Sequence, residues 1–154
     1  LLLALPFPSD HVDTLTLFDD PFYLATLPAS ALAKSVKLRT RDLQGTDMLL
    51  LEEGHCLRDH ALEACKLGEK DVKVPYQATS LTTIVQMVAN GIGTTLLPKM
   101  AIDAGITQGT ELVLRPFDEP DISRKIGLMW RKKTPRKHEF TLLGAFIEEC
   151  LLTQ

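Results

Sequence analysis

Residues 80–98 read SLTTIVQMVANGIGTTLLP, a stretch that predicts a helix followed directly by a strand. Apolar side chains stand at positions 81, 84, 85 and 88, the spacing of a helix with one buried face. We expect Ser80 or the residue before it to cap this helix and Asn90-Gly91 to end it. Thr94–Leu97 then has the composition of a buried strand, which Pro98 halts.

The same alternation continues on both sides of this stretch. Strands are predicted at Leu15–Phe18, Phe22–Leu27, Asp47–Leu51, Val72–Tyr76, Leu112–Phe117 and Lys125–Trp130, and helices at Ala29–Lys34, Leu57–Leu67, Met100–Ala104 and Lys137–Leu152. A turn at Asp19-Asp20-Pro21 is expected to separate the first two strands, and Gly68 to stop the second helix. Strands alternating with helices predict an α/β fold with a largely parallel sheet.

Composition excludes several classes of protein. The chain has 154 residues, of which 45% are hydrophobic and 24% charged, enough for a core without disulfides or a structural metal. A net charge of −3 argues against nucleic-acid binding by this part of the protein alone. Three cysteines are too few for a secreted disulfide framework and favour a reducing compartment. The opening Leu1–Leu5 run is too short for a membrane helix and lacks signal-peptide features. Because the chain starts at Leu on an apparent strand, we expect it to be a piece of a longer protein.

The segment EEGHCLRDHALEAC, residues 52–65, carries the most chemistry in the chain. Cys56 follows a glycine-containing loop and is expected in the first turn of a helix, where unpaired N–H groups favour negative charge. His55 and Arg58 supply further donors nearby. Since the thiolate is the nucleophile of cysteine chemistry, this is the setting that a reactive cysteine requires.

The spacing of Cys56 and Cys65 adds a geometric condition. In one continuous helix, nine residues separate the two sulfurs by roughly 13 Å along the axis and by about half a revolution. A disulfide needs Cα atoms roughly 4.4–6.8 Å apart. If this pair forms a bridge, the segment between must therefore unwind or refold.

Three interpretations of these residues stay open at this point. Each cysteine can be a small buried apolar residue. His55, Cys56, His60 and Cys65 can instead hold a metal, although their spacing matches no common zinc pattern. The third interpretation is a redox pair. Cys150, beside Ile147 and Leu151, is expected to be a packing residue.

Four sequence blocks resemble a known family. The run Gly54–Asp59, with Cys65 beyond it, resembles the hydrogen-peroxide sensors of the OxyR type, a branch of the LysR-type transcription regulators. The blocks at residues 78–81, 87–98 and 126–131 are similar to the effector domains of LysR-type regulators in general.

The resemblance implies a role for each of several residues. Cys56 would be the peroxide-reacting thiolate and Cys65 the resolving thiol, joined in a reversible disulfide. His55, Asp59 and Arg124 match positions that form the peroxide pocket in that family. Thr94 and Thr95 are weaker candidates, for the effector cleft. No metal or cofactor is implied.

The resemblance also implies an architecture and partners. LysR effector domains resemble periplasmic binding proteins, with two α/β lobes of mainly parallel sheets. Residues 19–122 would form lobe II, and residues 1–18 and 123–154 what this chain holds of an incomplete lobe I. DNA would be bound by an N-terminal helix-turn-helix domain not present in this chain. A cytoplasmic homodimer or homotetramer acting with RNA polymerase, without membrane contact and without enzyme turnover, would be the working form.

Two rival functions remain. A LysR-type effector domain can bind a small organic ligand in the cleft between its lobes, with Cys56 merely buried. A thiol-based enzyme is the other, and the lack of a Cys-x-x-Cys pair argues against it.

Overall fold

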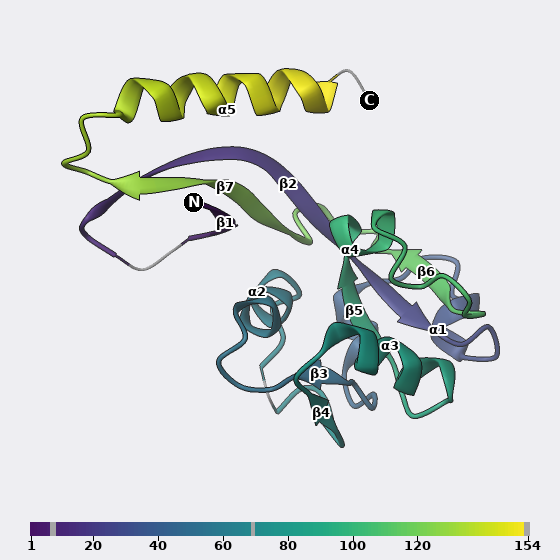
Figure 1. Ribbon diagram of the computed structural model, residues 1–154. Coiled ribbons are helices and arrows are strands. Elements are labelled where there is room, and N and C mark those ends of the chain that lie inside the picture. Colours follow the sequence, from purple (N-terminus) through teal and green to yellow (C-terminus); the bar gives the residue numbers. More distant parts are fainter. Residues whose placement is uncertain (7–8, 69, 153–154) are drawn as a thin grey trace. The chain divides into compact units, whose positions relative to one another are not determined.

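The computed structural model describes residues 1–6, 9–68 and 70–152 as a mixed α/β chain (Figure 1), which confirms the predicted fold class. In chain order the elements are β1 (Leu2–Leu5), β2 (Val12–Thr26), α1 (Ala31–Lys34), the 3-10 helix η1 (Thr40–Leu43), β3 (Leu50–Leu51), α2 (Cys56–Ala64), β4 (Gln77–Ala78), α3 (Leu81–Ala89), β5 (Thr95–Pro98), α4 (Lys99–Asp103), β6 (Val113–Pro116), β7 (Ser123–Arg131) and α5 (Lys137–Leu152). They form two compact units. Unit 1 comprises residues 1–20 and 124–154, and unit 2 comprises residues 21–123.

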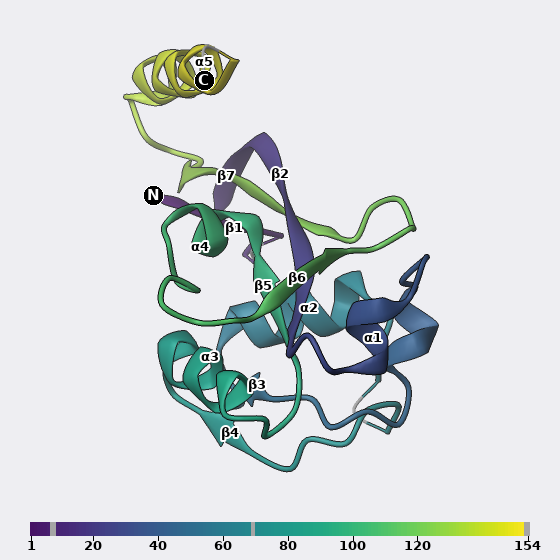
Figure 2. The same cartoon turned by 90° about the vertical axis from the view of Figure 1, so that its right-hand side faces the viewer.

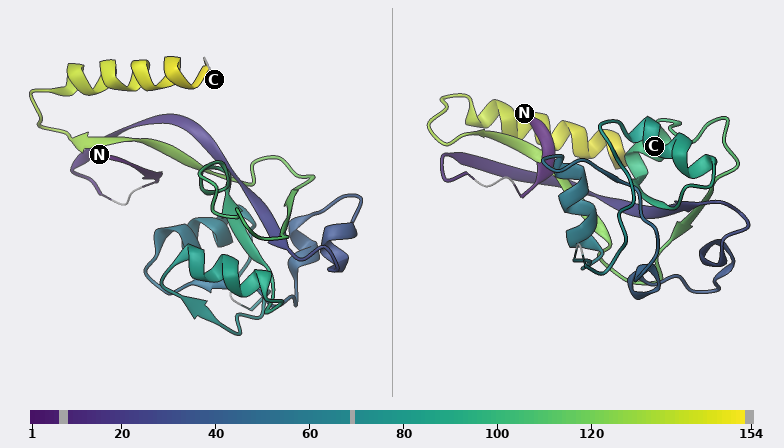
Figure 3. Two further views of the ribbon diagram at one scale, coloured as in Figure 1. Left: turned by 45° about the vertical axis from the view of Figure 1, so that its right-hand side comes forward. Right: turned by 90° about the horizontal axis from the view of Figure 1, so that it is seen from below.

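Unit 1 consists of a small sheet and one long helix. β1 pairs antiparallel with β7, β7 lies next to β2, and α5 runs along these strands (Figure 3). The helix approaches the sheet at the buried Gly144, where a Cβ would lie 2.4 Å from Cδ2 of Leu15. Trp130 stacks on Phe140 with ring centroids 5.6 Å apart. Cys150 is exposed, so the prediction that it packs in a core is wrong.

Unit 2 is built around the last part of β2. This strand pairs antiparallel with β5 through Phe22–Ala25 and with β6 through Tyr23–Thr26. On α3 the predicted positions Ile84, Val85 and Val88 are buried, and the helix lies beside β3 and β4 (Figure 2). Phe22 and Leu24 of β2, Leu50 of β3, and Leu62 and Cys65 at the end of α2 belong to one hydrophobic cluster. The second cysteine is therefore part of the core.

The turn predicted at Asp19-Asp20-Pro21 is absent, because β2 continues through these residues without a break. Pro21 has no N–H to donate, so a strand tolerates it only where no ladder bond is needed. It stands where the strand passes from unit 1 to unit 2, and pairing with β5 begins at the next residue, Phe22. One strand thus belongs to both units.

Parallel pairing is less extensive than the alternation of elements predicts. The longer strands pair antiparallel, and parallel pairing occurs at β3–β4 and at the bridges Asp47–Lys73 and Met48–Thr94. The predicted strand at Val72–Tyr76 is wrong beyond the single bridge at Lys73, and β4 begins only at Gln77. Pro75 explains this difference, because its missing N–H interrupts a ladder.

Candidate functional site

Cys56 is the first residue of α2, directly after a tight turn. His55 N–H donates to the Glu52 carbonyl at 3.3 Å, and Gly54 has φ 90°, a value that β-turns place at their third residue. A Cβ added to Gly54 would meet nothing within 4 Å, so glycine is favoured there by backbone conformation alone. His55 is the N-cap residue. Cys56 lies in the first turn of a helix, as predicted, and its side chain is exposed.

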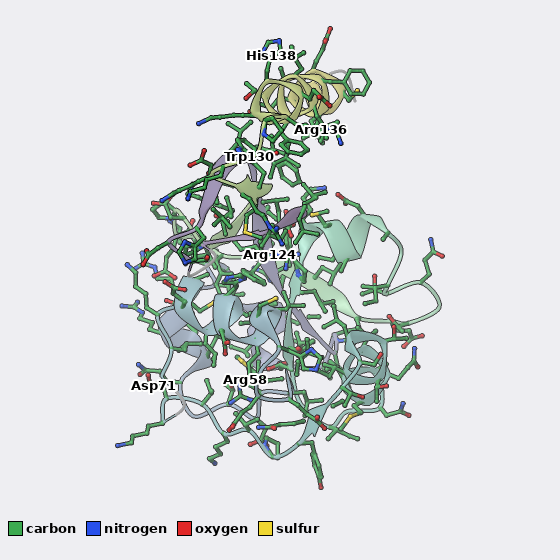
Figure 4. The ribbon with its side chains drawn as sticks, turned by 60° about the vertical axis from the view of Figure 1, so that its left-hand side comes forward. Arg58, Asp71, Arg124, Trp130, Arg136 and His138 are labelled. Carbon is green, nitrogen blue, oxygen red and sulfur yellow. The ribbon has the colours of Figure 1, made fainter. Side chains whose placement is uncertain are left out.

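Arg58, one turn into α2, ties the helix to the strand before the turn (Figure 4). The residue is only 4% exposed, and its Nη1 donates to the Leu51 carbonyl at 3.2 Å. A hydrogen bond from a charged donor is worth about 1.5–3 kcal/mol. Arg58 thus holds the two ends of the 52–55 turn together. From the sequence, Arg58 is expected only to be a donor near Cys56.

The helix ends earlier than predicted, at Ala64 with Cys65 as the C-cap rather than at Leu67. Lys66 N–H donates to the Glu63 carbonyl at 3.0 Å and Leu67 N–H to the Leu62 carbonyl at 2.9 Å. These two bonds form a Schellman motif. The motif requires a left-handed backbone conformation at the residue directly after the C-cap. Lys66 fills that position with φ 52°, although it has a Cβ. Leu62 and Leu67 are both buried in one cluster, the hydrophobic contact that accompanies the motif.

Replacing Lys66 by glycine is expected to stabilise the reduced chain. The left-handed conformation costs a residue with a Cβ about 1 kcal/mol that glycine avoids, so Lys66→Gly is expected to raise the free energy of unfolding by about 0.5–1 kcal/mol. Urea unfolding followed by circular dichroism measures this change. Glu63→Gly, at an exposed position inside the same helix, is the control and is expected to lower the same quantity by about 1 kcal/mol. Destabilisation by both substitutions would contradict the role given to Lys66.

Cys65 differs from Cys56 in its exposure to solvent. Its side chain is 1% exposed and packed in the core of unit 2. Burial, with a further contribution from the negative charge of Glu119, raises the pKa of the Cys65 thiol from 9.0 to about 12. As long as α2 ends at Ala64 and Cys65 stays in the core, the Cys65 thiol is protonated and inaccessible to solvent.

The raised pKa of Cys65 predicts a loss of stability in alkali. Between pH 9 and 12 the unfolded thiol releases its proton whereas the folded thiol keeps it, so stability falls as pH rises. The unfolding free energy is expected to fall by about 1 kcal/mol more between pH 9 and pH 10 than in Cys65→Ala. Urea unfolding of the parent chain and of Cys65→Ala at several pH values measures the difference. Equal slopes for the two proteins would contradict it.

The two sulfurs are far from bonding distance in this state. α2 is helical from Cys56 to Ala64, and neither cysteine is in a disulfide. Helix geometry places these two positions roughly 13 Å apart along the axis. A bridge between them therefore requires the helix to come apart, which is the condition derived from the spacing.

The residues expected to surround Cys56 are divided between the two units. His55 and Asp59 are exposed and belong to the start of α2, beside Cys56 in sequence. Arg124 belongs to unit 1, where its Nε donates to Oδ2 of Asp20 at 2.9 Å and its Nη2 lies 2.9 Å from the same oxygen in an ion pair. Asp20 is 1% exposed and the Arg124 side chain 15% exposed, so this is a buried ion pair. Asp20 is not predicted from the sequence to be the partner of Arg124.

Thr94 and Thr95 have internal partners. The Thr95 hydroxyl, 1% exposed, donates to the Leu49 carbonyl at 2.8 Å. Thr94 makes a longer contact, 3.4 Å, with the Asp47 carbonyl, and it also lines a cavity in unit 2. Both contacts join β5 to the segment that leads into β3. Their assignment to an effector cleft stays a prediction.

Within the described ranges, no group of three or more His, Cys, Asp or Glu side chains is arranged to hold a metal ion. The set of His55, Cys56, His60 and Cys65 therefore does not converge, since the helix separates its two cysteines.

Comparison with known proteins identifies the family. The family model described as the LysR substrate binding domain matches residues 1–151. The chain belongs to this LysR family. It is a family of transcription-regulator domains rather than of enzymes.

Similar LysR proteins include named peroxide regulators. A probable hydrogen peroxide-inducible genes activator of Streptomyces viridosporus is 38% identical over 152 residues, 98% of this chain and 49% of that protein. The DNA-binding transcriptional dual regulator OxyR of Escherichia coli is 35% identical over 147 residues, 96% of this chain and 48% of that protein. The reduced regulatory domain of OxyR2 from Vibrio vulnificus is 40% identical with a TM-score of 0.84, over 96% of this chain and 70% of that one. This LysR chain thus spans about half the length of these two curated relatives.

No helix among its described residues has the length and apolarity that crossing a membrane requires.

Proposed function

We propose that this LysR chain is the redox-sensing part of a peroxide-responsive, cytoplasmic transcription regulator. The observation that supports this most is the contrast between its two cysteines. Cys56 is exposed at the first residue of α2, whereas Cys65 is buried at the end of the same helix. The names of its relatives supply the oxidant and the regulatory context.

The proposed chemistry proceeds in two steps. The Cys56 thiolate attacks one oxygen of hydrogen peroxide, the O–O bond breaks, and the departing hydroxide takes a proton to become water. Cys56 is then a sulfenic acid. After the end of α2 unwinds, the Cys65 sulfur attacks the Cys56 sulfur, an S–S bond replaces the S–O bond, and a second water leaves. Peroxide is reduced by two electrons and the two thiols are oxidised to one disulfide.

His55, Asp59 and Arg124 are proposed to form the peroxide pocket with Cys56. In this proposal Arg124 donates to the leaving oxygen, and Asp20 fixes the orientation of its guanidinium through the buried ion pair.

Refolding of the 57–66 segment would alter subunit packing in a homodimer or homotetramer. An N-terminal helix-turn-helix domain outside this chain would bind DNA and engage RNA polymerase.

Mass spectrometry after one equivalent of hydrogen peroxide tests this proposal. Peptides of the oxidised chain are expected to show Cys56 joined to Cys65, and Cys65→Ser is expected to carry a sulfenic acid on Cys56. Cys150→Ser is the control, and it is expected to form the same Cys56–Cys65 bridge because Cys150 lies on α5 in unit 1. A chain in which both thiols persist after this treatment would refute the redox function.

A second candidate function follows from the family description itself, which names a substrate-binding domain. In that case the domain binds a small organic ligand between its lobes, with Thr94 and Thr95 as contact candidates. A ligand-induced rise in the unfolding temperature that persists in Cys56→Ser would favour this function.

A further inference from the structure

The residue directly after the second cysteine has a strained backbone. Eight described residues have a positive φ, and six of them are glycines. The other two are Asp121, a residue type that tolerates the left-handed conformation, and Lys66, with φ 52°. Lys66 is therefore the one described residue with a long side chain in this conformation, and it follows Cys65 directly. Strain of this kind is found preferentially at functional sites and switch segments.

No contact of the lysine side chain accounts for the strained position. Lys66 is exposed, and among the described residues its side chain has neither a hydrogen bond nor an ion pair. Gly68, which could adopt this conformation without strain, stands two residues further along the chain. Packing compensates for the strain instead, because the left-handed turn brings Leu67 into the same core cluster as Leu62 and Cys65.

The strain is present only while the end of α2 is intact. Two hydrogen bonds hold Lys66 in the left-handed conformation. Its own N–H donates to the Glu63 carbonyl, and Leu67 N–H donates to the Leu62 carbonyl. A disulfide between Cys65 and the first residue of α2 requires this helix to come apart, so both bonds are lost and residue 66 is free to adopt an ordinary φ. Oxidation therefore releases the strain.

We propose that Lys66 sets the redox equilibrium of the cysteine pair, by making the reduced chain less stable than it would be with glycine at this position. This inference rests on the redox function proposed above and identifies the residue that adjusts it. In exchange with oxidised glutathione, the Cys56–Cys65 disulfide forms, the glutathione disulfide breaks, and the two thiol protons and two electrons pass to two molecules of reduced glutathione. Strain in the dithiol state shifts this exchange toward the protein disulfide.

Equilibration of a Cys150→Ser parent chain in buffers of reduced and oxidised glutathione measures this shift. Mass spectrometry of acid-quenched samples gives the ratio of Cys56–Cys65 disulfide to dithiol, and hence the equilibrium constant for disulfide formation. Lys66→Gly is expected to lower this constant about two- to five-fold, which corresponds to about 0.5–1 kcal/mol at about 1.4 kcal/mol per factor of ten. Lys66→Asn is expected to lower it by a smaller factor, because asparagine tolerates the left-handed conformation better than lysine does.

Two further variants separate strain from other effects of the substitution. Lys66→Ala removes the charge but keeps a Cβ and therefore the strain, so its equilibrium constant is expected to stay within about 1.5-fold of the parent's. Glu63→Gly weakens the interior of α2 at an exposed position and is expected to raise the constant about five-fold, the opposite direction to Lys66→Gly.

The possible results distinguish failure of this inference from failure of the redox function. A parent chain that never forms the Cys56–Cys65 disulfide refutes the redox function itself. A disulfide that forms equally readily in the parent and in Lys66→Gly overturns the inference alone, as does an equal shift in Lys66→Ala, which assigns the effect to charge. Urea unfolding of the disulfide forms checks the direction, because Lys66→Gly is expected not to stabilise a chain from which the left-handed conformation is absent. Equal stabilisation of the oxidised and reduced chains would also overturn the inference.

Discussion

Alkylation of Cys65 in the folded, reduced chain is expected to be about a thousand-fold slower than in the urea-unfolded chain at pH 8. Alkylating agents react with the thiolate, and a pKa of about 12 in place of 9.0 lowers the thiolate fraction by about that factor. Packing of Cys65 in the core of unit 2 slows the reaction further, because the reagent cannot reach a side chain that is 1% exposed. The measurement is the iodoacetamide rate of Cys65 in a Cys56→Ser/Cys150→Ser background.

Cys56 supplies the matched control for this experiment. In Cys65→Ser/Cys150→Ser the remaining thiol is exposed in the folded chain, and folding is expected to change its rate by less than about ten-fold. Comparable protection of the two cysteines would contradict the proposed order of events, in which Cys56 reacts first. Rapid alkylation of Cys65 without denaturant would show instead that the end of α2 opens on its own.

Which cysteine reacts first depends on the end of the helix that each one occupies. The start of the helix was predicted to within one residue, at Leu57 rather than Cys56, because a turn-forming glycine just before it is a local signal. The end was not predictable, because Gly68 is the residue that a sequence pattern favours for a helix stop. The helix ends at Ala64 instead, since packing of Leu62 and Leu67 in the core compensates for the left-handed backbone at Lys66.

Regular elements with one buried face were the most predictable part of the fold. The helix at Leu81–Ala89 and the strand at Thr95–Pro98 follow from periodicity and from their end signals. The continuity of β2 through Pro21 was not predictable, because it depends on where the strand changes pairing partners. The same limit applies to the cavity of unit 2, which is assembled from three separate segments of the chain.

Asp20 illustrates this limit most clearly, because it lies 104 positions from Arg124 and no local pattern links the two. Asp20→Ala is expected to lower the free energy of unfolding of unit 1 by about 3–5 kcal/mol, since it leaves a largely buried guanidinium without its counter-ion. Trp130, the single tryptophan of the chain, is 8% exposed and reports unfolding of this unit by fluorescence. The apolar double variant Asp20→Leu/Arg124→Met is expected to recover most of the loss, because it removes both buried charges.

The neighbouring pair Asp19–Lys125 separates the effect of burial from that of charge. Its N–O distance is 3.0 Å, close to the 2.9 Å of Asp20–Arg124, yet its side chains are 57% and 60% exposed. Solvent screens such a pair, so Asp19→Ala is expected to change the unfolding free energy by less than about 1 kcal/mol. Equal losses in Asp19→Ala and Asp20→Ala would contradict the argument from burial. A large loss confined to Asp20→Ala means that the orientation of Arg124 is fixed by the fold, before any oxidant binds.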